Sequence, residues 1–140
     1  MGLQDNAIFI IDEIVKKIEG LLYRHGFDKK IRTSDKSIFA EKLFYQQDEF
    51  ELEIVACVHP HDYPYSLNVR FVNKTLYNYK YIELLDLINL SSKKHISEEY
   101  TLLIATDKQI ESTITLVYEL LQYILEENLL EQWSKMLSKK

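Results

Sequence analysis

Two stretches of alternating apolar and polar residues, 50–58 and 65–71, constrain this chain more than any other feature. Successive side chains of a β-strand point to opposite faces, so each stretch predicts a strand with one apolar and one polar face. Between them lie Pro60 and Pro64, which indicate a turn. The pattern is typical of an antiparallel pair that is packed on one side and hydrated on the other. The predicted packed side contains Phe50, Leu52, Ile54, Ala56, Val58, Tyr65, Leu67, Val69 and Phe71.

Helices are predicted both before and after these strands along the chain. Residues 5–25 carry isoleucine, valine and leucine at helical spacing, and Gly26 follows as a helix stop. Residues 81–90 and 107–138 show the same spacing. Each of these segments therefore predicts an amphipathic helix that covers the apolar side of the sheet.

The remaining segments complete a single predicted domain. Residues 38–45 and 100–105 favour strands because they are rich in aromatic, β-branched or other apolar residues, whereas 28–36 is polar and predicts a connection. We therefore expect an α+β fold with an antiparallel sheet of three to four strands and with helices packed on one face. The expected element order is α-β-β-β-α-β-α, in one domain over residues 1–140.

The last predicted helix is long for a domain of this size. A continuous helix over 107–138 would measure about 48 Å, whereas the radius of gyration of such a domain is about 14 Å. We expect the helix to break near Asn128 and to leave a helical extension over about 128–140. A helix that projected instead would expose Leu129, Leu130 and Trp133, and a homodimer through this C-terminal helix would cover them.

The charge of the chain indicates the kind of partner it could bind. Its 22 acidic and 17 basic residues give a net charge of −5, and much of the excess negative charge falls in residues 37–73. An acidic chain without a basic stripe argues against nucleic-acid binding. A protein partner with a basic surface fits this charge.

The acidic residues of the central segment predict a docking surface. Glu51 and Glu53 alternate with apolar residues and should project from the hydrated side, with Glu41 of the preceding strand across from them. We expect a non-enzymatic protein-binding module that uses this face, although a solvated face without a partner would have the same pattern. The candidate partner-binding residues are Glu41, Asp48, Glu49, Glu51, Glu53, Asp62, Tyr63 and Tyr65.

The segment 57–62 contains the candidate metal ligands. Cys57, His59 and His61 are spaced by two and would share a face of an extended strand. Pro60 fits poorly inside a sheet ladder, which favours a turn with exposed histidines and no metal ion. A small metal-dependent enzyme that uses this turn is left as an alternative.

Other features bear on catalysis and location. Glycine occurs only at positions 2, 20 and 26, so the chain has no glycine-rich phosphate loop and no nucleophile elbow. We therefore expect no enzymatic activity and no cofactor.

Apolar runs such as 102–105 are too short to span a membrane. The lone Cys57 and the absence of a basic segment followed by an apolar stretch at the start predict a cytoplasmic protein.

Two resemblances extend these expectations. A helix that ends at His25-Gly26-Phe27, followed by a basic tract, a strand and an aromatic-rich antiparallel sheet, resembles small bacterial immunity proteins that neutralise toxins. This resemblance covers residues 8–72 and implies a bacterial protein that binds a toxin. The order helix, three strands, helix, strand, helix, on an acidic chain, is also similar to type III secretion chaperones, which implies a homodimer that holds an extended effector segment.

Overall fold

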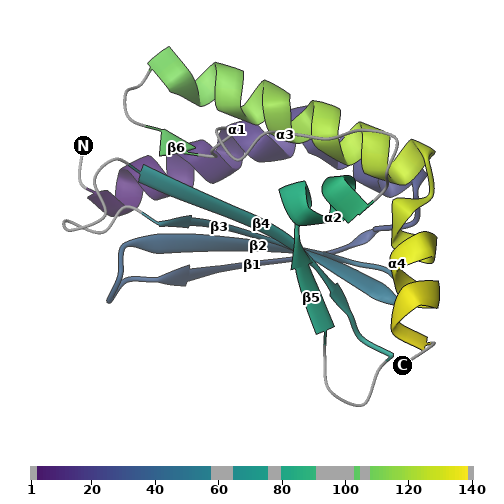
Figure 1. Cartoon of the computed structure of the whole chain (residues 1–140). Coiled ribbons are helices and arrows are strands. Elements are labelled where there is room, and N and C mark those ends of the chain that lie inside the picture. Colours follow the sequence, from purple (N-terminus) through teal and green to yellow (C-terminus); the bar gives the residue numbers. More distant parts are fainter. Residues whose placement is uncertain (1–2, 58–64, 76–79, 91–102, 105–107, 139–140) are drawn as a thin grey trace.

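The computed structural model describes residues 3–57, 65–75, 80–90, 103–104 and 108–138. The fold is α+β, with an antiparallel sheet and helices on one of its faces, as expected (Figure 1). In chain order the elements are α1 (Leu3–Arg24), β1 (Lys29–Asp35), β2 (Ala40–Gln46), β3 (Phe50–Cys57), β4 (Tyr65–Asn73), β5 (Lys80–Glu83), α2 (Leu84–Leu90), β6 (Leu103–Ile104), α3 (Lys108–Glu126) and α4 (Leu129–Ser138).

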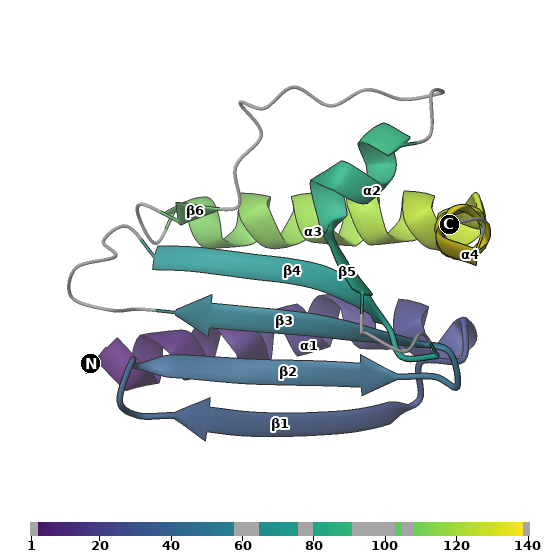
Figure 2. The ribbon, with the colours of Figure 1, turned by 60° about the horizontal axis from the view of Figure 1, so that its bottom comes forward.

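The sheet is an antiparallel meander in the described part of the chain. Its strands follow the order β1-β2-β3-β4-β5, and β6 pairs with β4 on the same edge as β5 (Figure 2). Helix α1 lies against β2 and β3, and α3 packs beside α1. Helix α2 contacts α3 and α4. Helices α1, α2 and α3 share one side of the sheet, and α4 runs across one end of it (Figures 1 and 2). No described helix covers the other side.

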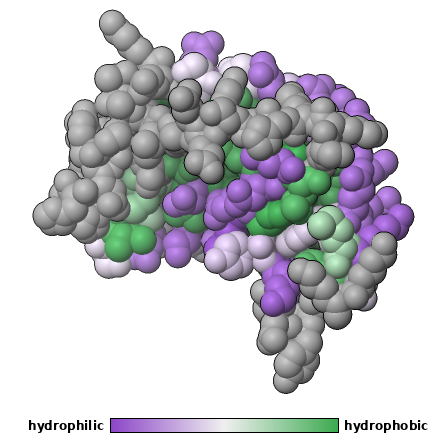
Figure 3. All heavy atoms as spheres, viewed as in Figure 1, coloured by the Kyte–Doolittle hydropathy of each residue, from purple (hydrophilic) through white to green (hydrophobic). Residues whose placement is uncertain are grey.

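The core lies between the helices and the sheet. Phe50, Leu52 and Ile54 of β3 and Val69 and Phe71 of β4 are buried on the helix side, which confirms the predicted apolar face. Val58 lies outside the described residues. Apolar residues are visible between the helical layer and the sheet, with hydrophilic residues around them (Figure 3). We call the helix side of the sheet the inner face and the opposite side the open face.

The basic tract expected to be a connection is a strand, so that expectation was wrong. Lys29–Asp35 pairs along its whole length with Ala40–Gln46. The tract lacks apolar alternation because its inner-facing residues are polar. Lys30, Arg32 and Ser34 occupy the positions opposite the inner-facing Tyr45, Leu43 and Glu41. Lys30 and Arg32 form ion pairs with Glu19 and Asp12 of α1, and these pairs take the place of the usual apolar packing.

The segment 81–90 also differs from its prediction as one helix. Lys80–Glu83 forms β5 and pairs with Arg70–Asn73, and the helix α2 covers only Leu84–Leu90. Tertiary pairing with the edge of β4 overrides the local helical spacing here. In the predicted strand 100–105, only the two residues of β6 are described as strand. The sheet therefore has more strands than the three to four expected.

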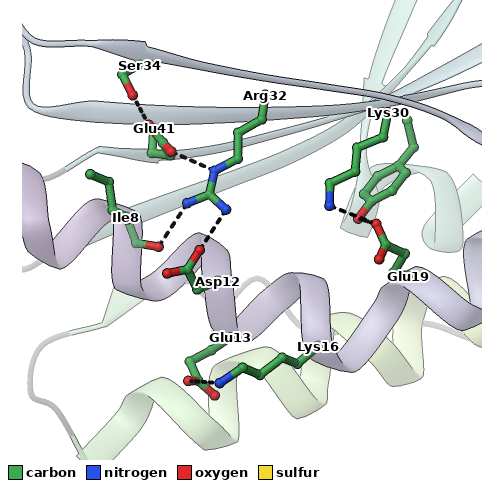
Figure 4. A network of polar contacts seen from close by, with 10 residues as sticks. Ile8, Asp12, Glu13, Lys16, Glu19, Lys30, Arg32, Ser34 and Glu41 are labelled. Carbon is green, nitrogen blue, oxygen red and sulfur yellow. Dashed lines mark hydrogen bonds and ion pairs between the residues drawn. The ribbon is translucent and has the colours of Figure 1, made fainter.

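Arg32 ties the edge strand to α1. Its Nε donates to a carboxylate oxygen of Glu41 at 2.6 Å, its Nη1 to Asp12 at 2.7 Å and its Nη2 to the carbonyl of Ile8 at 3.2 Å (Figure 4). Ser34 donates its hydroxyl to the other carboxylate oxygen of Glu41. Glu41 is only 4% exposed, and a buried carboxylate is costly unless it is paired and hydrogen-bonded. Arg32 and Ser34 supply those partners.

A second polar contact joins the same two elements further along α1. Glu19 accepts hydrogen bonds from Lys30 at 2.9 Å and from the hydroxyls of Tyr23 and Tyr45 at 3.0 Å each. Partial burial raises the pKa of Glu19, but the bonds from Lys30, Tyr45 and Tyr23 outweigh it and leave this pKa below its ordinary value. Burial and the bond to Glu19 raise the pKa of Tyr45, which therefore stays protonated.

The predicted break near Asn128 is confirmed. Helix α3 ends at Glu126, α4 begins at Leu129, and Asn128 between them has a φ of 54°. Asparagine adopts this left-handed conformation more readily than most residues. The turn brings α4 back onto the domain, where Trp133 stacks on Phe50 with a ring separation of 6.2 Å. Leu129, Leu130 and Trp133 are buried within the chain, so they do not need a second copy to cover them.

Trp133→Ala should lower the free energy of unfolding by about 3–5 kcal/mol, because it removes a large buried ring and leaves a cavity. The ring is 5% exposed in the protein, whereas Met136 on the same helix is 47% exposed. Met136→Ala is therefore the control and should change the free energy by less than about 0.5 kcal/mol. Urea unfolding followed by circular dichroism measures both. Equal losses in the two variants would contradict the packed position of α4.

Glu19→Gln should destabilise the protein in a pH-dependent way. A carboxyl whose pKa is lowered by folding adds stability above its unfolded pKa, and this is lost as the pH falls through its folded pKa. The difference between the parent and the variant should therefore be largest from about pH 5 to pH 7 and should shrink below about pH 4. Urea unfolding at a series of pH values measures it. A difference that stays constant down to pH 3 would contradict the contact with Lys30, Tyr23 and Tyr45.

Candidate functional site

The open face of the sheet is the candidate site because the register places polar and aromatic groups there in ordered rows. One row runs from Phe44 on β2 through Glu53 and Arg70 to Glu83 on β5. Directly opposite residues on neighbouring strands point to the same face and contact one another. The open face is therefore a continuous four-strand surface rather than a set of separate side chains.

A second row lies beside the first. It runs from Gln46 on β2 through Glu51 and Val72 to Tyr81 on β5. Gln46 donates its side-chain amide to the carboxylate of Glu51. Tyr81 ends the row and is 60% exposed, which makes it the most exposed of the large apolar side chains described.

Arg70 holds the centre of the open face in place. Its Nε donates to one oxygen of Glu53 at 3.0 Å and its Nη2 to the other at 3.2 Å. This forked contact fixes the guanidinium plane. The guanidinium also lies 4.5 Å from the centre of the Tyr81 ring, which is a cation–π distance. Arg70 thus positions both a carboxylate and an exposed aromatic ring.

Glu83, the other carboxylate of the first row, differs from Glu53 in its contact with Arg70. It stands next to Arg70 in the first row, yet Arg70 gives its hydrogen bonds to Glu53. Partial burial raises the pKa of Glu83, and the negative charges of Asp86 and Glu53 add to this rise against the opposing field of Arg70. Glu83 is thus a partly buried carboxylate whose ionised form is disfavoured by its surroundings.

The predicted partner-binding residues take different positions. Glu51 and Glu53 do lie on the open face, as expected, and Asp48 is exposed in the connection between β2 and β3. Glu49 is turned toward α4, where it accepts a hydrogen bond of 2.6 Å from Ser134. Tyr65 belongs to β4 and pairs with Ile104, but its side chain is not described. Asp62 and Tyr63 lie outside the described residues.

Glu41 does not lie across from Glu51 and Glu53 on the same face, so its predicted place was wrong. It pairs with Ala56 and shares the inner face with Leu43 and Tyr45. The sequence segment 38–45 has apolar residues at both parities, which hides the face to which Glu41 belongs. Glu41 is a buried anchor for Arg32 and is not available to a partner.

Sequence reasoning missed Arg70, Tyr81 and Glu83 as parts of the site. Arg70 had a usable signal, because it alternates with Val69 and Phe71 and so had to face the hydrated side. Tyr81 had the signal of a tyrosine cluster with Tyr77 and Tyr79, which also fits residues that only cover a sheet edge. Glu83 had none, because its segment shows helical spacing. Only the pairing of β5 with β4 brings them to Arg70.

Of the three predicted metal ligands, only Cys57 lies in the described part of the chain. His59 and His61 lie outside the described residues, and Cys57 donates its thiol to the carbonyl of Ile38 at 3.4 Å. In the described ranges, no three side chains of the metal-binding types come close enough to share an ion.

A separate groove of about 640 Å³ lies between α1 and α3. Phe9, Ile10 and Ile114 line it together with charged residues that include Lys17 and Glu111. Lys17 is directed over the ring of Tyr118 at 5.3 Å. The groove is an apolar trough with a charged rim, whereas the open face displays its polar groups in register.

Comparison with protein-family models, with curated proteins and with solved structures finds no match for this chain. Among the helices of the described residues, none combines the length and the apolar character that crossing a membrane requires. The function must therefore be inferred from the geometry and charge of the open face.

Proposed function

We propose that this chain is a non-enzymatic protein-binding module that docks its partner on the open face of the sheet. The observation that carries the proposal is the exposed Tyr81 held over Arg70, in register with Glu51, Glu53 and Glu83. Tyrosine and arginine are enriched where protein interfaces concentrate their binding energy. A sheet face that displays both residues is suited to contact with a protein surface.

The ordered state of these groups supports binding. Arg70 already donates two hydrogen bonds to Glu53, from Nε and Nη2, and its guanidinium lies against the ring of Tyr81. Side chains that are fixed before binding lose less conformational entropy when the partner docks. The centre of the open face is thus prepared for contact without rearrangement.

The charge around this centre supports a partner with a basic surface. Glu51 and Glu83 flank the neutralised pair of Glu53 and Arg70, and Asp48 adds an exposed carboxylate at the nearby end of the sheet. Opposite charge on the partner would speed the encounter and fix its orientation. An immunity-type role, in which this chain covers and neutralises a basic toxin, is the form of protein binding that we propose.

Capture of partners from cells of the source organism tests this proposal. Glu51→Lys/Glu83→Lys should lower the recovery of a specific partner about tenfold or more, because two attractive contacts become repulsive. Glu119→Lys/Glu131→Lys is the matched control, since it changes the net charge equally at exposed positions of α3 and α4. Quantitative mass spectrometry of the captured proteins at two salt concentrations measures the recovery.

The control variant should retain the partner, and higher salt should weaken capture by the parent chain. Tyr81→Ala should lower recovery as well, whereas Met136→Ala, at an exposed position of α4, should not. A partner that is recovered equally with the open-face variants and the controls would contradict docking on this face. Loss of recovery with the α3 and α4 variants alone would place the binding surface on the helices.

A further inference from the structure

The outer edge of β1 is an unpaired strand edge in the described structure. β1 is the terminal strand of the sheet, and its other edge pairs with β2 without interruption from Lys29 to Asp35 (Figure 2). The strand contains no proline or glycine, and its ladder has no bulge. Such an edge presents a row of free backbone donors and acceptors to another strand.

Two of the three basic residues of β1, Lys30 and Arg32, do not protect this edge in the usual way. Lysine and arginine on an edge strand normally repel a second strand. Here Lys30 is paired with Glu19, and Arg32 is paired with Asp12 and Glu41 under α1 (Figure 4). Their charges are neutralised within the chain. Ile31 between them is 47% exposed, so an apolar side chain is presented next to the free edge.

The charges at the two ends of the strand are self-complementary. Asp28 and Lys29 stand at its start, and Asp35 and Lys36 stand at its end. In an antiparallel pairing of two copies centred on Arg32, Lys29 lies opposite the partner's Asp35 and Asp28 opposite the partner's Lys36. Ile31 then lies opposite the partner's Thr33. Two-fold symmetry repeats each of these contacts.

We propose that the chain forms a homodimer in which β1 pairs antiparallel with β1 of a second copy, centred on Arg32. A shift of two residues in either direction separates Lys29 from the partner's Asp35 and Asp28 from the partner's Lys36. The charges therefore favour the register centred on Arg32.

The centre of the proposed pairing tolerates two arginines. Each Arg32 is bound to two carboxylates of its own chain and is turned toward α1 rather than toward the edge. Each Arg32 cluster, with Asp12 and Glu41, carries a net negative charge instead of a free positive one. Asp35 carries the negative charge that the pairing with the partner's Lys29 needs. Hydrogen bonds from Ser37 keep the pKa of Asp35 below the ordinary value and hold the carboxylate ionised.

The proposed dimer has a consequence for the open face. A two-fold axis perpendicular to the sheet joins the two sheets into one and keeps all helices on the same side. The open faces of the two copies then form one continuous surface. A dimeric or repetitive partner could engage both copies at once and gain avidity. This pairing is independent of whether the open face binds a partner, because it joins the edges of two β1 strands and uses neither Arg70 nor Tyr81.

Sedimentation velocity over a range of protein concentrations tests the dimer. The parent chain should pass from monomer to dimer, and Lys29→Glu or Asp35→Lys alone should raise the dimer Kd at least about tenfold, because two attractive pairs become like-charge pairs. The double variant Lys29→Glu/Asp35→Lys should restore the dimer. This rescue separates the contact from any defect in the turn at Asp35.

Lys135→Glu on α4 is the matched control and should leave the dimer intact. A parent chain that stays monomeric up to high micromolar concentration would overturn the proposal. So would a dimer that survives both single reversals. Dissociation by Lys135→Glu alone would move the interface to the C-terminal helix and overturn pairing through β1.

Disulfide trapping fixes the register. In a Cys57→Ser background, Lys29→Cys/Asp35→Cys should give a covalent dimer on oxidation, because opposite Cα atoms of an antiparallel pair lie about 4.5–5.5 Å apart. The two positions are about 20 Å apart within one strand and cannot join in the same chain. Lys29→Cys/Thr33→Cys is the control and should trap the dimer poorly. Equal trapping by both pairs would overturn the register.

Discussion

The guanidinium of Arg32 is the contact on which the rest of this structure depends. It joins the edge strand β1, the buried carboxylate of Glu41 on β2 and both a side chain and a carbonyl of α1. Without it, Glu41 would be an uncompensated charge in the core and β1 would have little to hold it, because its inner-facing residues are polar. Lys30 and Glu19 repeat the same arrangement further along α1. The sheet is thus fastened to α1 at one edge by charge and over its centre by apolar packing.

This fastening separates the two faces of the sheet. The charged residues of β1 that face α1 are neutralised there, and the buried residues of β3 and β4 hold the helices on the same side. Arg70, Glu53, Glu83 and Tyr81 are left on the other side, in register across three strands. The open face follows from this arrangement, since no described helix covers it. The free edge of β1 follows from its place as the terminal strand of the sheet.

Sequence patterns predicted the parts of the fold that rest on apolar periodicity. The alternation in β3 and β4, the first helix and the break at Asn128 all have local signals. The patterns failed where polar contacts or strand pairing decide the structure. β1 has no apolar face because α1 supplies carboxylates to it, and β5 is a strand only because β4 offers it an edge. Glu51 and Glu53 could be placed because they stand in the alternating strand β3, whereas Glu41, Tyr81 and Glu83 could not.

Hydrogen exchange of the β1 amides in Arg32→Met, at a concentration at which the chain is monomeric, is the most direct test of the role given to Arg32. Arg24→Met, at an exposed position of α1, is the matched control. In the parent chain and the control, the β1 amides that pair with β2 should exchange slowly. In Arg32→Met they should exchange much faster while β3 stays protected. Slow exchange of β1 in Arg32→Met, equal to that in the control, would contradict the role of Arg32.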